Sequence, residues 1–198
     1  GDGRVMFNGG GIIKLSAPRG ARLGIGGTFQ VPREFAHLTV RENLLAAAPG
    51  QLGEQVINLV LKPGAVQRQE ARLSAKADEI LKFLNLAAVS DENATRLSGG
   101  QKKLLELGRV LMTDPKLILL DEPFAGVNPV LIGEISERIR ELQADGIGFL
   151  IVEHNLNALS AIVSRMYAMD RGVIIGAGNP TDLLASEHVR EAYMGGVA

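Results

Sequence analysis

Residues 116–123 read KLILLDEP, and this stretch decides the fold class. Four apolar residues stand in a row without a helical period, so residues 116–120 are predicted to form a buried β-strand. The strand ends in two carboxylates, Asp121 and Glu122. Similar apolar runs, such as residues 149–152, alternate along the chain with helical patterns. This alternation predicts an α/β fold.

The two carboxylates at the end of this strand have two interpretations. In α/β proteins ligands bind at the carboxyl ends of strands, and an Asp at such a place commonly holds Mg²⁺ directly or through water. A neighbouring Glu accepts a proton from an attacking water. The alternative is a solvated acidic turn, because short motifs also occur by chance. Asp121 and Glu122 are therefore candidates for metal binding and general-base chemistry, respectively.

A second stretch, residues 97–101, reads LSGGQ. Its glycines let backbone N–H groups approach an anion closely, and the helix that follows directs its positive end to the same place. Ser98 and Gln101 have the capping-box spacing, so an ordinary helix start is the alternative. Five specified residues in this order are a more specific signal than a lone glycine-rich loop. Lys102 and Lys103, which follow, are predicted to form a solvated helix edge.

Composition and charge exclude several classes of protein. Hydrophobic residues make up 46% and charged residues 22% of the 198 residues, as in ordinary globular domains. The net charge of −1 gives no overall attraction to nucleic acid, so no nucleic-acid partner is expected. There is no Cys, which excludes disulfides, thiolate zinc sites and a cysteine nucleophile. No apolar run is long enough to cross a bilayer, so a link to a membrane is expected to run through a partner.

Cap and turn signals predict further elements. Residues 39–42 have capping-box spacing and begin a helix. Apolar residues with helical spacing predict a second helix over residues 74–85, whereas the weak pattern over residues 51–72 predicts an irregular insertion. A tight turn is predicted at Asn8-Gly9, and a β-hairpin around Arg171-Gly172.

The order of these motifs resembles that of ABC ATPases. Residues 97–101 resemble the signature sequence of that family, and residues 117–123 resemble its Walker B strand with the catalytic Glu. His154, after the second strand, stands where the family has its switch His. Gln30, at the end of GGTFQ, stands where it has the Q-loop Gln. The resemblance covers essentially the whole chain and implies a P-loop NTPase-like core with a helical subdomain.

Finer features resemble the ATP-binding subunits of branched-chain amino acid importers. These are the sequences of residues 23–35, 38–43 and 122–129, and the ending YMG at residues 193–195. Close relatives in that subgroup carry urea or short amides. The resemblance therefore leaves branched-chain amino acids, urea and related small amides open as the transported substrate.

The resemblance also implies a role for each matching residue. Asp121 and Gln30 would contact Mg²⁺, and Gln30 would report to the membrane partner. Glu122 would polarise the attacking water, and His154 would contact the γ-phosphate. ATP would lie between two subunits that face each other head to tail. The residues that would meet the opposite subunit or its nucleotide are Ser98, Gly99, Gly100, Gln101 and Asn128.

The main departure from the family is the P-loop. The chain contains no G-x-x-x-x-G-K-[ST], and residues 1–4, GDGR, resemble the segment that follows the P-loop helix. We therefore expect an N-terminally incomplete copy that is inactive alone, whereas the intact protein would be an ATPase. Residues 1–38 and 96–198 are assigned to the ATPase core, and residues 39–95 to the helical subdomain.

The implied partners are a second ATPase subunit, identical or different, and transmembrane permease subunits at the cytoplasmic face of the cell membrane. A periplasmic or extracellular substrate-binding protein would act indirectly. One alternative is a soluble ABC ATPase that acts on DNA or the ribosome, but the stretch between Gln30 and Ser98 has no sustained heptads of a coiled coil. The other is a non-catalytic remnant, which the absent P-loop favours and the intact Glu122 and His154 oppose.

Overall fold

The computed structural model describes residues 3–28, 34–51 and 63–194. They fall into two compact units, Gly1–Val152 and Glu153–Ala198. Gln30 lies outside the described residues. No helix in the described ranges is long and apolar enough to cross a membrane.

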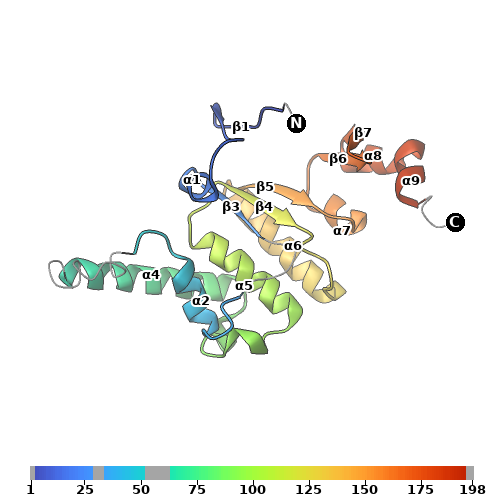
Figure 1. Cartoon of the computed structure of the whole chain (residues 1–198). Coiled ribbons are helices and arrows are strands. Elements are labelled where there is room, and N and C mark those ends of the chain that lie inside the picture. Colours follow the sequence, from blue (N-terminus) through green and yellow to red (C-terminus); the bar gives the residue numbers. More distant parts are fainter. Residues whose placement is uncertain (1–2, 29–33, 52–62, 195–198) are drawn as a thin grey trace. The chain divides into compact units, whose positions relative to one another are not determined.

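The first unit contains a three-stranded parallel sheet (Figure 1). Its strands, in order across the sheet, are β3 (Ile25–Gly27), β4 (Leu117–Asp121) and β5 (Gly148–Val152). Parallel neighbours need crossover connections, and helices supply them here. The predicted α/β fold is therefore confirmed. Because Asp121 pairs with Val152, β4 and β5 end level with each other.

Two helices, α5 (Gly99–Leu111) and α6 (Pro129–Ala144), cover one face of this sheet (Figure 1). Ile118 and Leu120 of β4 are 0% and 5% exposed. Burial of each such side chain stabilises the fold by about 1.5–3 kcal/mol. The helices contribute the buried side chains Leu104, Leu107, Leu111, Ile135, Ile139 and Leu142.

The opposite face of the sheet is exposed among the described residues. Leu119, Leu150 and Val152 are 37%, 59% and 61% exposed. The prediction of buried strands is therefore right for Ile118 and Leu120 of β4, whereas in β5 Phe149 and Ile151 are only half-buried. Successive strand residues point to opposite faces, and a continuous apolar run carries no period to show which face is covered.

The helices α2 (Val40–Ala47) and α4 (Pro63–Phe83) pack against α5 in the first unit. A Cβ on Gly108 of α5 would lie 2.9 Å from Leu44 Cδ2, so this glycine permits the close approach. The prediction of an irregular segment over residues 51–72 is wrong from residue 63 onward, where α4 begins; residues 52–62 lie outside the described ranges. Among residues 64–72 only Val66 is buried, so no apolar period announces this half of the helix.

Smaller elements complete the first unit. Strands β1 (Met6–Phe7) and β2 (Gly10–Gly11) form a hairpin whose turn residues Asn8 and Gly9 have φ angles of 48° and 78°, which confirms the predicted tight turn. The capping box over residues 39–42 is also confirmed at the start of α2. The other short helices in the described part of this unit are α1 (Ala17–Arg22), η2 (Ala87–Val89) and η3 (Ala94–Arg96).

The second unit is built on the antiparallel pair β6 (Met166–Asp170) and β7 (Val173–Gly178). The predicted hairpin around Arg171-Gly172 is confirmed. A Cβ on Gly176 would lie 2.7 Å from Leu183 Cδ1, so α8 packs closely on β7. Residues 153–194 of this unit form the helices α7 (Leu156–Ser160), α8 (Pro180–Ala185) and α9 (Glu187–Met194).

Candidate functional site

The end of β4 carries the acidic turn, which we define as residues 121–125. Asp121 is the last residue of the strand and is exposed. Glu122 adopts a left-handed backbone conformation with φ of 49°, which is costly for a residue with a side chain. Its N–H donates to the carbonyl of Val152 at 2.8 Å, and its own carbonyl accepts from the N–H of Ala125 at 3.2 Å. Hydrogen bonds on both sides therefore hold Glu122 in this conformation.

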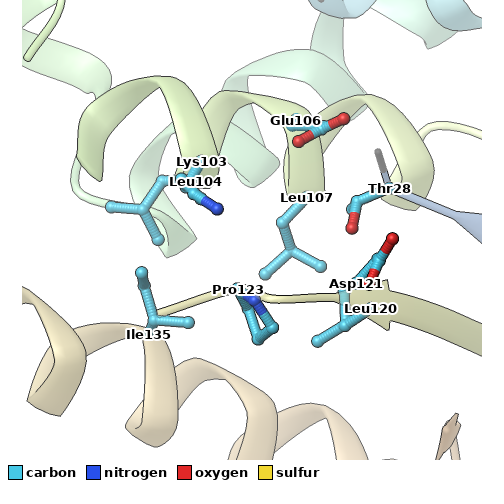
Figure 2. Close-up of a pocket in the computed structure, with 9 residues that line it drawn as sticks. All are labelled: Thr28, Lys103, Leu104, Glu106, Leu107, Leu120, Asp121, Pro123 and Ile135. Carbon is cyan, nitrogen blue, oxygen red and sulfur yellow. The ribbon is translucent and has the colours of Figure 1, made fainter. Parts of the chain in front are cut away.

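A small cavity of about 20 Å³ lies between this turn and α5 (Figure 2). Figure 2 shows Asp121 and Thr28 on the same side, with Glu106 of α5 beyond Thr28. A volume of this size holds about one water molecule, far less than a nucleotide needs. This cavity is therefore not a nucleotide site.

The signature loop, residues 97–101, leads into α5. Ser98 is the N-cap: its Oγ accepts from the N–H of Gln101 at 3.3 Å, and Gln101 Oε1 accepts from the N–H of Ser98 at 3.0 Å. The predicted capping box is therefore confirmed. The first turn of a helix presents backbone N–H groups and a positive dipole end, which suit an anion.

The two glycines of the signature loop have different surroundings. A Cβ on Gly99 would meet no atom within 4 Å, whereas a Cβ on Gly100 would lie 1.5 Å from Leu131 Cδ2 of α6. Gly99 thus leaves the helix start open to a ligand. Gly100 is needed for α5 to pack against α6, a reason that the sequence does not reveal.

Asn128 begins α6 beside this contact. Its Oδ1 accepts from the N–H of Leu131 at 3.0 Å, so the side chain caps the helix. Because Leu131 also meets Gly100, the starts of α5 and α6 lie next to each other. The structure thus brings together the signature loop and the segment that carries Asn128.

His154 belongs to the second unit, and its side chain is 68% exposed. Its Nδ1 lies 3.4 Å from Oε1 of Glu153, whose side chain is fully buried. The same carboxylate oxygen accepts from the N–H groups of His154 and Asn155 at 3.0 and 3.1 Å. Glu153 therefore fixes the backbone of this segment while the imidazole faces solvent.

The two lysines after the signature loop correct the prediction of a solvated helix edge. Lys102 Nζ donates to Glu34 Oε1 at 2.7 Å, with both side chains at most 25% exposed. Lys103 Nζ donates to the carbonyl oxygen of Glu122, also at 2.7 Å. Burial raises the pKa of the Glu34 carboxyl, but the hydrogen bond from Lys102, a backbone hydrogen bond and the nearby charges of Lys102 and Arg109 together outweigh it, so this pKa lies below its ordinary value.

A wider groove of about 690 Å³ is lined by residues of β3, α2 and α5. The Arg109 guanidinium lies over the Phe35 ring, 4.6 Å from its centre, a cation–π arrangement. Burial lowers the pKa of Arg109 against the opposing effect of Glu106. Thr28 and Phe35 both line this groove. In the sequence, Thr28 precedes the segment that holds Gln30 and Phe35 follows it.

The same motifs occur together in known proteins. A family model described as ABC transporter matches residues 2–125. The chain belongs to this family. Members of the family hydrolyse ATP and couple the hydrolysis to transport. The predicted membership of the ABC ATPase family and the predicted fold are therefore confirmed.

Individual relatives of this ABC ATPase include transport proteins of archaea and bacteria. This chain is 42% identical to a probable branched-chain amino acid transport ATP-binding protein LivG of Archaeoglobus fulgidus over 194 residues, which are 98% of this chain and 74% of the relative. LivG of Methanocaldococcus jannaschii is 39% identical over 198 residues, 98% of this chain and 76% of the relative. The lipopolysaccharide export ATP-binding protein LptB of Escherichia coli K12 is 34% identical over 98% of this chain and 74% of the relative.

Solved structures show the same fold. A nucleotide-free ATP-binding cassette from an ABC transporter superimposes with a TM-score of 0.80 at 39% identity, covering 97% of this chain and 77% of that chain. The ADP conformation of an ATP-binding cassette superimposes with a TM-score of 0.79 at 38% identity, covering 97% of this chain and 76% of that one. ATP and ADP are thus the nucleotides of this family.

Proposed function

We propose that this protein is the ATP-hydrolysing subunit of an ABC importer and that the acidic turn is its hydrolytic centre. The observation that carries the proposal is the placement of Glu122. It stands at the end of β4 and is tied through its carbonyl to Lys103 of the helix that begins at the signature loop. A carboxylate at a strand end, on a residue whose backbone is fixed by hydrogen bonds, is suited to accept a proton from water.

Mg²⁺ would be held by Asp121, with Gln30 as a second contact. The residues present fit this ion: the Asp121 carboxylate is exposed at the end of its strand, and Mg²⁺ commonly binds one or two carboxylates together with substrate phosphates. Within the described ranges no three His, Asp or Glu side chains gather into a metal cage. When bound, the ion would neutralise the charge of the phosphates.

The other site residues would act on the nucleotide from two sides. Glu122 would accept the proton of the attacking water, and His154, with its exposed imidazole, would contact the γ-phosphate. Across the dimer, the opposite subunit would offer its helix start at Ser98, Gly99, Gly100 and Gln101. Asn128, beside that helix start, would touch the partner subunit.

The partners that we propose are a second ATPase subunit and transmembrane permease subunits. The protein would lie at the cytoplasmic face of the membrane and would meet an external substrate-binding protein only indirectly. A permease segment could be seated in the groove that the stacked side chains of Phe35 and Arg109 line. Residues 1–38 and 96–198 would then serve as the ATPase core and residues 39–95 as the helical subdomain.

The proposed substrates are branched-chain amino acids or related small amides. The support is the 42% and 39% identity to the two archaeal LivG proteins. The 34% identity to LptB, an export protein, is lower over the same share of this chain.

The test uses a P-loop-bearing version, defined as the chain preceded at Gly1 by a segment that carries G-x-x-x-x-G-K-[ST] and the helix that follows this motif. Glu122→Gln keeps the size of the side chain but removes the proton acceptor. Loss of a general base should lower ATP hydrolysis by about 10²–10⁴-fold, with ATP affinity nearly unchanged. The matched control, Asp121→Asn, should weaken Mg²⁺-dependent nucleotide binding as well. Hydrolysis at the parent rate in Glu122→Gln would make Glu122 an ordinary acidic turn residue.

A further inference from the structure

Lys103 reaches from α5 to the backbone of the acidic turn. Its Nζ donates to the carbonyl oxygen of Glu122 at 2.7 Å, and Figure 2 shows the side chain extending from the helix toward the chain at Pro123. The donor is an ammonium group, and hydrogen bonds from charged donors are stronger than those between neutral groups. The same oxygen also accepts from the N–H of Ala125 at 3.2 Å.

The carbonyl of Glu122 matters because the residue is backbone-strained. Its φ of 49° lies in the left-handed region, and a non-glycine residue persists there only when its surroundings hold it. The N–H of Glu122 is fixed by the carbonyl of Val152 at 2.8 Å. Lys103 and Ala125 fix the other end of the residue. The direction of the Glu122 side chain from its Cα therefore depends on these three contacts.

We infer that Lys103 is a positioning residue for Glu122, a role that rests on the proposed hydrolytic function of that glutamate. Lys103 acts through the backbone: it holds the peptide group after Glu122, so the carboxylate projects in one direction toward the attacking water. Misplacement of a reacting group by about 1 Å can cost about 10²-fold in rate. Lys103 thus affects the rate of the chemical step, whereas other residues determine nucleotide affinity.

The experiment measures kcat and KM for ATP hydrolysis in the P-loop-bearing version. Lys103→Met keeps the apolar length of the side chain and removes the donor. We expect kcat to fall about 10- to 100-fold, with KM within about twofold of the parent. Lys103→Arg, which restores a charged donor, should recover most of the loss.

Lys76→Met is the matched control. Lys76 Nζ donates to another backbone carbonyl, that of Met112 at the far end of α5, at 2.9 Å. Its loss removes the same kind of hydrogen bond away from the acidic turn, together with an ion pair to Asp114 at 2.8 Å, so kcat should stay within about twofold. An equal fall of kcat in Lys76→Met and Lys103→Met would show a general effect on folding and overturn the inference.

A double variant separates this inference from the proposed function. If Lys103 works through the Glu122 carboxylate, Lys103→Met should change the residual rate of Glu122→Gln by less than about twofold. A full further loss in the double variant, or a parental kcat in Lys103→Met alone, would refute the positioning role while Glu122 stays catalytic. A parental rate in Glu122→Gln alone would reject the function of Glu122 itself, and the inference with it.

Discussion

Replacement of Gly100 by alanine tests the packing of the signature helix directly. The added Cβ would lie 1.5 Å from Leu131 Cδ2 and 2.6 Å from its Cγ, so a change at the tip of Leu131 is not enough. Either the whole Leu131 side chain adopts another rotamer or α5 moves away from α6. Overpacking of this kind costs about 1–3 kcal/mol, and the better helix propensity of alanine offsets about 0.5–1 kcal/mol of it.

The expected net loss for Gly100→Ala is up to about 2.5 kcal/mol in the free energy of unfolding. At about 2–4 °C per kcal/mol for a domain of this size, Tm should fall by up to about 10 °C. Thermal unfolding of the 198-residue chain, followed by circular dichroism, measures the change. Gly99→Ala is the control, because its Cβ would enter open space and should leave Tm equal or higher.

The cause of the loss can be checked with Leu131→Ala, which deletes the two atoms that clash. The Cβ of Leu131 would lie 3.6 Å from the new Cβ, an ordinary contact. In the Leu131→Ala background, Gly100→Ala should therefore cost nothing or stabilise the chain. If Gly100→Ala were as stable as Gly99→Ala, or if Leu131→Ala gave no relief, the packing role of Gly100 would be wrong.

Two other predictions concern ATP binding by the chain as it stands and dimerisation through the signature loop. The 198-residue chain should bind ATP-Mg²⁺ weakly or not at all, because no backbone cradle or lysine of a P-loop is present in the sequence; calorimetric titration with micromolar affinity would contradict this. In the P-loop-bearing version, Ser98→Arg should block ATP-driven dimerisation yet spare nucleotide binding to the same subunit. A normal ATP-dependent dimer on size-exclusion chromatography would show that Ser98 does not face the opposite subunit.

Local sequence signals predicted the helix starts and turns well. The capping boxes at residues 39–42 and 98–101 form as expected, because they depend only on side chains three residues apart. The strand that ends at Asp121 was located to within one residue, since an apolar run closed by charged residues has a clear limit. The part of the site that lies on consecutive residues is therefore visible in the sequence.

Long-range contacts of polar side chains could not be predicted in this way. Lys102 and Lys103 are adjacent in the sequence, yet one pairs with Glu34 and the other with the carbonyl of Glu122. Successive residues of a helix point about 100° apart, so neighbours reach different segments. Every residue has a backbone carbonyl, so the sequence does not indicate which one accepts a hydrogen bond. The first half of α4 was not predicted as a helix for a related reason: it buries little apolar surface, so its sequence shows no helical period.

These contacts make α5 the element that relates the parts of the first unit's site to one another. Its N-cap belongs to the signature loop, its Gly100 touches α6, and its Lys103 holds Glu122. Lys102 joins the same helix to Glu34, which follows the segment that contains Gln30. A displacement of α5 that keeps these contacts must therefore move the signature loop and the acidic turn together.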